Sequence, residues 1–113
     1  MKICDLQDFT GGWFIGNFEP AIQKTEDVEC AVKLYKAGDK EKKHYHAVAT
    51  EITVIVSGTV EMNQVSYSAG SIVVVEPNEA FDFYAVTDAV TGVVKIPSII
   101  GDKYIVESAI SND

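Results

Sequence analysis

The sequence contains no arginine, and this absence limits the partners that the chain can bind. Its nine basic residues are all lysines and face 17 acidic residues, giving a net charge of −8 and a pI near 4.6. Nucleic acids and anionic membranes are bound through a surplus of Lys and Arg, so we expect neither as a partner. Arginine also provides the bidentate clamp for phosphates and carboxylates. Its absence favours a neutral, hydroxyl-rich small molecule as the ligand or substrate.

Cysteine and long apolar segments are also scarce. Cys4 and Cys30 are the only cysteines, and the N-terminus does not have the basic and apolar regions of a signal peptide. We therefore expect two free thiols in a reducing, cytoplasmic compartment. Cys30 alternates with Val28, Val32 and Leu34, which predicts a thiol packed among apolar side chains. No apolar run has the length of about 18 residues that a membrane helix needs.

No segment shows a sustained helical period, whereas short β-prone segments separated by turn signals recur along the chain. Seven to ten such strands predict an all-β sandwich or barrel, and 113 residues predict a single domain. We expect an N-terminal strand region at residues 1–27, a core at about 28–97 and a tail at 98–113 that ends in frayed residues, Ser111–Asp113. The charged run at 38–43 is expected to be a solvated loop, or alternatively a lip in which Lys42 or Lys43 attracts an anionic substrate.

Alternation within two segments predicts which side chains share a face. In residues 50–57, Glu51 lies on one face and a β-branched stripe at 52, 54 and 56 lies on the other, which we expect to be covered by another apolar layer. Residues 71–76 are almost continuously apolar, which predicts a strand covered on both sides. If Phe81 and Phe83 pack between the sheets, then Asp82 and Tyr84 point into the cavity.

The two histidines are the strongest candidates for a functional site. His44 and His46 are the only histidines, and residues i and i+2 of a strand point to the same face. With Glu51 they provide two imidazoles and one carboxylate, a set that suits a divalent transition metal with open coordination positions. The alternative is a pair of hydrogen-bonded histidines on a barrel wall.

The spacing around these residues also resembles a known motif. Gly38, five residues, His44-x-His46, four residues, Glu51, six residues and Gly58 are similar to the first motif of the cupin superfamily. The resemblance implies a double-stranded β-helix, or jelly-roll barrel, in which His44, His46 and Glu51 bind a metal. It also implies a homodimer.

The second cupin motif is only partly present. Gly70 and Pro77 match it, but one extra residue lies between them and Glu79 replaces the second glycine. Asp82 stands where the family has its third histidine, so the resemblance implies Asp82 as a substituted fourth ligand. Asp82 is alternatively an acceptor that orients a histidine, or a general base. Tyr84, on the same face, either donates a proton or packs.

Two functions from different classes follow. The first is a metal-dependent enzyme that acts on a small, sugar-like metabolite, such as an isomerase or dioxygenase, with Asp82 and Tyr84 as catalytic candidates. The second is a non-catalytic cupin that binds a small ligand. The ligand set suits Mn, Fe, Zn or Ni. Trp13 is either a stacking platform for a ligand or a residue of the core or a dimer contact.

Overall fold

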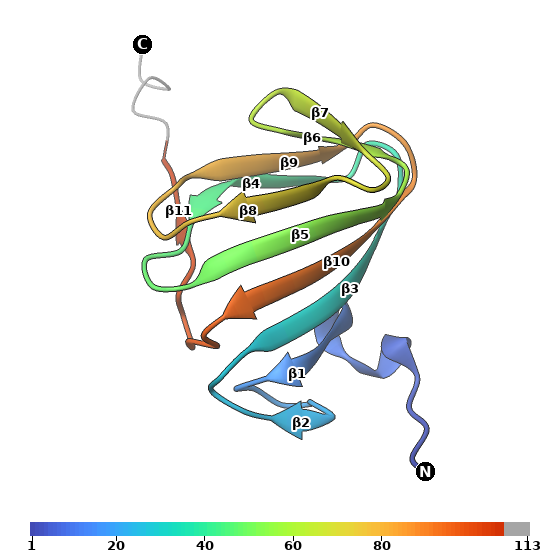
Figure 1. Ribbon diagram of the computed structural model, residues 1–113, viewed down its shortest axis with the longest axis vertical. Coiled ribbons are helices and arrows are strands. Elements are labelled where there is room, and N and C mark those ends of the chain that lie inside the picture. Colours follow the sequence, from blue (N-terminus) through green and yellow to red (C-terminus); the bar gives the residue numbers. More distant parts are fainter. Residues whose placement is uncertain (108–113) are drawn as a thin grey trace.

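Two facing β-sheets make up the chain, and the computed structural model describes residues 1–107 (Figure 1). The expected frayed end, Ser111–Asp113, lies outside the described residues. The all-β prediction is confirmed. Two short 3-10 helices precede the strands, η1 (Leu6–Asp8) and η2 (Thr10–Gly12). The strands are β1 (Trp13–Gly16), β2 (Gln23–Lys24), β3 (Glu29–Tyr35), β4 (Lys40–Tyr45), β5 (Thr50–Ser57), β6 (Thr59–Met62), β7 (Val65–Ser68), β8 (Ile72–Val75), β9 (Phe81–Ala85), β10 (Ala89–Ile96) and β11 (Tyr104–Ile105).

The strand order produces a jelly-roll arrangement. One sheet has the order β2-β1-β3-β10-β5-β8 and the other β11-β4-β9-β6-β7. All pairings are antiparallel except that of β1 with β2. The C-terminal segment runs along the end of the barrel, where β11 pairs with β4 (Figure 1). Among residues 1–107, no helix has the length and apolar character needed to cross a membrane.

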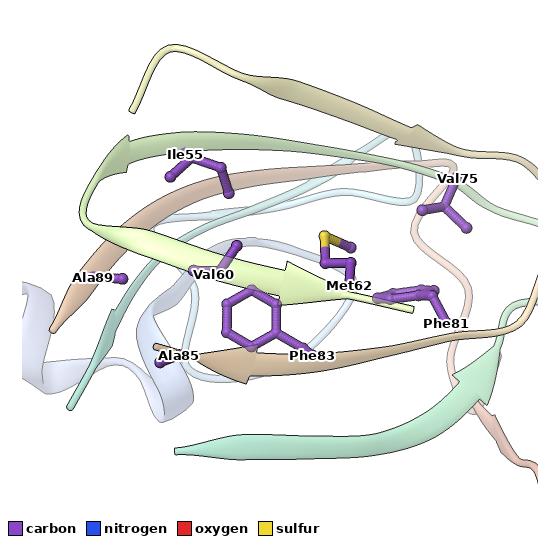
Figure 2. Packing of buried hydrophobic residues seen from close by; sticks show 8 residues of the cluster. All are labelled: Ile55, Val60, Met62, Val75, Phe81, Phe83, Ala85 and Ala89. Carbon is purple, nitrogen blue, oxygen red and sulfur yellow. The ribbon is translucent and has the colours of Figure 1, made fainter. Parts of the chain in front are cut away.

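The apolar core lies between the sheets and takes in the inner faces of β6 and β9. Phe81 and Phe83 are each 4% exposed, which confirms that they pack between the sheets, and the ring of Phe83 lies 4.4 Å from that of Tyr35. Figure 2 shows these rings pointing toward Met62 and Val60 from β6. Ile55, Val75, Ala85 and Ala89 complete the cluster.

The inner faces of β3 and β5 carry polar side chains beside the buried Ala31 and Ile55, and their outer faces are mostly apolar. Glu51 is 8% exposed and faces the interior, whereas Val56, on the predicted covered stripe, is 57% exposed. Leu34 on β3 is 68% exposed, and Cys30 on the same face is only half-buried. Ile52, Val54 and Cys30 are only partly buried, so within residues 1–107 of a single chain the stripe is not fully covered and Cys30 is not fully packed. Alternation identified the two faces, but the enclosed face is the one that carries the polar side chains.

Two further segments differ from expectation. Within β8, Ile72 and Val74 are 62% and 51% exposed, so this strand is covered on one side only within the described residues. Most of the charged run at 38–43 belongs to strand β4. Alternation along this strand turns the side chain of Glu41 inward. There Glu41 accepts hydrogen bonds from Lys33 Nζ at 3.2 Å and Tyr35 Oη at 2.7 Å. The inward carboxylate thus has half-buried partners that hold this segment in the sheet.

Candidate functional site

The two histidines lie side by side inside the barrel, as the i, i+2 spacing predicted. Both are 3% exposed, and their ring centroids are 5.3 Å apart in an edge-to-face arrangement. His44 pairs with Phe81 across β4 and β9, and their ring centroids are 4.5 Å apart. His44 Nδ1 is 2.7 Å from the carbonyl oxygen of Lys42. A carbonyl only accepts hydrogen bonds, so Nδ1 carries the proton and Nε2 keeps a free lone pair.

Both imidazoles are held in the neutral form that binds metals. Burial lowers the pKa of His44 below its usual value. Burial, followed by the charge of Lys95, lowers the pKa of His46 to about 4. At neutral pH neither ring is protonated, so both are competent to act as ligands through nitrogen.

We expect the stability of the metal-free protein to fall as the pH drops from 6.5 to 4. In this range the unfolded chain protonates His46, whose usual pKa is 6.5, and the folded chain does not. The free energy of unfolding should therefore be highest above pH 6.5 and decrease by up to about 3 kcal/mol as the pH falls to 4. Urea unfolding with a chelator present, compared between the wild type and His46→Asn, measures this loss. If the free energy of unfolding changed with pH by the same amount in the two proteins, this expectation would be contradicted.

Glu51 lies in the same interior but does not complete a set of three ligands. It stands opposite Lys95 in the pairing of β5 with β10, and its Oε2 accepts a hydrogen bond from Thr53 Oγ1 at 3.2 Å. Burial raises the pKa of Glu51, against the opposing charge of Lys95. Within residues 1–107, no three side chains of His, Cys, Asp or Glu come close enough together to hold a metal. The structure therefore brings the two imidazoles together and leaves Glu51 as a buried carboxylate beside an ammonium group.

Asp82 and Tyr84 do not face the histidines. Phe81 and Phe83 occupy the inner face of β9, so alternation turns Asp82 and Tyr84 to its outer face, where Tyr84 is 43% exposed. The expectation that Asp82 and Tyr84 point into the cavity is wrong. Successive side chains of a strand point to opposite faces, so the residues next to inward-facing phenylalanines face outward. Asp82 instead accepts a hydrogen bond at 2.7 Å from the backbone N–H of Asn63 in the β6–β7 turn.

Asp102 is a site residue that the sequence analysis did not identify. It is 4% exposed, and its carboxylate accepts hydrogen bonds at 2.8 to 3.2 Å from three consecutive backbone N–H groups, those of Ala47, Val48 and Ala49. Burial acts to raise its pKa, but these hydrogen bonds outweigh it and lower the pKa. Asp102 thereby fixes the connection between His46 and Glu51. The only local signal was the turn-forming pair Gly101-Asp102, which does not reveal a partner more than fifty residues away.

Little free volume remains inside the barrel. The interior cavity, lined by Lys33, Tyr35, Glu41 and Glu51 among others, has a volume of about 30 Å³, enough for about one water molecule. Larger hollows of about 320 and 390 Å³ lie at its mouth and are both lined by Glu29 and Lys95. The larger free volumes therefore lie outside the interior cavity.

Comparison with solved structures identifies the fold. An uncharacterized conserved protein with a double-stranded beta-helix domain from Klebsiella pneumoniae is 17% identical, with a TM-score of 0.70 over 95% of this chain and 93% of that one. The chain has the cupin fold. The cupin-superfamily sugar phosphate isomerase from Silicibacter pomeroyi is also 17% identical, with a TM-score of 0.59 over 64% of this chain and 52% of that one.

Another similar structure was solved with a metal. The bacterial pirin YhhW from Escherichia coli, in complex with nickel(II), is 16% identical, with a TM-score of 0.65 over 77% of this chain and 39% of that one. No protein-family model matches the sequence, and no curated protein matches it. These likenesses agree with the cupin barrel that the motif implied, and at this level of identity they concern the fold alone.

Proposed function

We propose that this cupin is a small metal-dependent protein that binds one divalent ion through His44 and His46 and acts on a small polar metabolite. The observation that carries the proposal is the pair of buried, neutral imidazoles with Nε2 of His44 free. Two neutral imidazoles fit the donor chemistry of Mn, Fe, Zn or Ni. Glu51, the third ligand expected from the sequence, does not join this pair within residues 1–107, and Asp102 would act indirectly by holding the loop that follows His46.

A bound metal would supply a Lewis acid with open positions for substrate oxygens. The chain itself contributes burial, which excludes water, and Lys95, whose ammonium group lies across the strand pair from Glu51. A sugar-like substrate is supported by the sugar phosphate isomerase with the same fold. Asp82 and Tyr84 are left out of this proposed site, since they lie on the outer face of β9.

We expect purified, untagged protein from metal-replete cells to contain about one divalent ion per chain, as a single ligand cluster implies. His44→Ala and His46→Ala should each reduce the metal content at least about tenfold, because each removes one of two strong nitrogen ligands. Elemental analysis measures the content. Asp82→Ala is the matched control and should keep the wild-type content, because its carboxylate faces away.

A second function is favoured by one observation. Lys95 places a positive charge beside Glu51, where a dication would bind, and no three-ligand group forms within residues 1–107. A metal-free cupin that binds a ligand without turnover accounts for this arrangement. Metal-free wild-type protein from metal-replete cells would support this second function and contradict the first.

The homodimer that the cupin resemblance implied is also a proposal. The outward face of the six-stranded sheet exposes Leu34, Val56, Ile72 and Val74, each more than half exposed. Exposed apolar patches of this kind commonly mark interaction sites. A second copy that packs against this face would bury the β-branched stripe.

A further inference from the structure

Two adjoining hollows at the mouth of the barrel make a site separate from the histidine pair. Their volumes are about 320 and 390 Å³, which reaches the size of small-molecule pockets. Phe18, Glu29 and Lys95 line both of them. Their lining residues include Trp13 from β1, Glu29 from β3 and Lys95 from β10, and β1 extends the sheet beyond β3 (Figure 1).

Lys95 is held rigidly at the boundary between the two hollows. Its Nζ is 2.9 Å from Glu29 Oε1, and the two side chains are only 12% and 10% exposed. The other oxygen of Glu29 accepts a hydrogen bond from Ser98 Oγ at 2.6 Å, and Ser98 Oγ accepts one from the backbone N–H of Asn17 at 2.9 Å. Glu29 is thus fixed from both sides. An ammonium group has three donors, and the only ion-pair partner of Lys95 within residues 1–107 is Glu29, so donors remain for a ligand.

The acidic side chains that line these hollows already have partners. Glu19 pairs with Lys24 at 3.2 Å, and Glu29 is bound by Lys95 and Ser98. Asp102 accepts hydrogen bonds from three backbone N–H groups. The acceptors are therefore engaged while donors remain on lysine, and this imbalance favours a ligand that brings an anionic acceptor.

Two aromatic rings line the hollows, Phe18 in both and Trp13 in the first. The ring of Trp13 has Lys95 Nζ 5.5 Å from its centroid and Lys33 Nζ at 5.7 Å. The ring of Phe18 lies on Gly16, where an added Cβ would be 2.2 Å from its Cε2. Glycine at position 16 therefore lets this ring lie close to the backbone. Flat apolar walls of this kind accept an aromatic ring.

We propose that these hollows bind a small aromatic carboxylic acid, with its carboxylate on Lys95 and its ring against Trp13 and Phe18. The site is independent of the proposed metal, because neither histidine lines either hollow. A single lysine provides one charge-assisted contact to the carboxylate in place of an arginine clamp.

Trp13 is the only tryptophan and reports on the site directly. Titration of chelator-treated protein with benzoate should change its fluorescence saturably, with a Kd below about 1 mM. Benzamide, which keeps the ring but not the charge, should bind at least about tenfold more weakly. Calorimetric titration of the same protein checks the stoichiometry.

Two variants test the placement. The double variant Glu29→Gln/Lys95→Met removes both charges of the buried pair together, so that no unpaired charge remains. It should weaken the binding of benzoate at least about tenfold. Phe18→Ala, at a half-buried position, should weaken the binding of benzoate about fivefold. This variant gives a second test if the double variant does not fold. His46→Ala, which is designed to remove the metal, should bind benzoate like the wild type.

Each other outcome would overturn the proposal. No saturable benzoate binding would show that the hollows are not such a site. Equal affinity for benzamide would exclude recognition of the charge. Undiminished affinity in the folded double variant or in Phe18→Ala would place binding elsewhere, and equal loss in His46→Ala would assign it to the histidine pair.

Discussion

Replacing Gly58 with alanine is expected to lower the free energy of unfolding by about 3–5 kcal/mol. Gly58 has a φ of +84°, which is strained for any L side chain. An added Cβ would also lie 2.2 Å from the carbonyl oxygen of Asp88 and 2.8 Å from Ala89 Cα. Both obstacles are backbone atoms, which cannot move aside without displacing β10 from β5. Urea unfolding followed by circular dichroism measures the loss.

Gly38 is the matched control for this substitution. It is the other glycine of the same motif and has a similar φ of +94°, but no atom lies within 4 Å of an added Cβ. Gly38→Ala should therefore cost only the backbone strain, about 1–2 kcal/mol. Equal losses in the two variants would contradict the steric explanation and leave φ as the only reason for glycine at both positions.

Asp102→Ala is expected to cost about 3–4 kcal/mol of unfolding free energy. The substitution removes the acceptor for the backbone N–H groups of Ala47, Val48 and Ala49 at once, and Ala49 is only 1% exposed. Buried donors that lose a charged partner bear a full desolvation penalty. Because this loop joins His46 to Glu51, the variant should also lose metal content. Urea unfolding and elemental analysis measure the two effects.

Asp102→Asn should fall between alanine and the wild type, because an amide keeps one of the two acceptor oxygens. Asp82→Ala provides the comparison for a carboxylate that accepts one backbone N–H, that of Asn63, in a more exposed turn, and should cost about 1 kcal/mol. A loss for Asp102→Ala no greater than that for Asp82→Ala would show that water replaces the carboxylate in the loop.

Local signals in the sequence predicted much of the barrel. Alternation and turn residues identified the strands, and the turn at Asn63-Gln64 joins β6 to β7 with Met62 opposite Val65. Both turn residues have positive φ, at 51° and 67°, which asparagine tolerates. The two histidines share an inward face because that depends only on the two-residue repeat of a strand.

The direction of each face could not be predicted from the same signals. Alternation separates Ile52 from Glu51 but does not say which of them is enclosed. The usual assumption that the apolar face is buried failed on β3 and β5, because the barrel encloses ion pairs such as Lys95 with Glu29. On β9 the apolar face is the enclosed one, and the buried phenylalanines leave Asp82 on the outer face. Asp102 was missed because its partners are distant in the sequence.

The outward apolar face of the six-stranded sheet has a consequence for how copies of the chain would meet. Each copy carries a net charge of −8, so two copies repel one another at low ionic strength. At 0.1 M ionic strength the Debye length is only about 10 Å, so added salt screens this repulsion while the gain from burying Leu34 and Val56 remains. An association through this face would therefore tighten as ionic strength rises, opposite to the behaviour of a contact made of ion pairs.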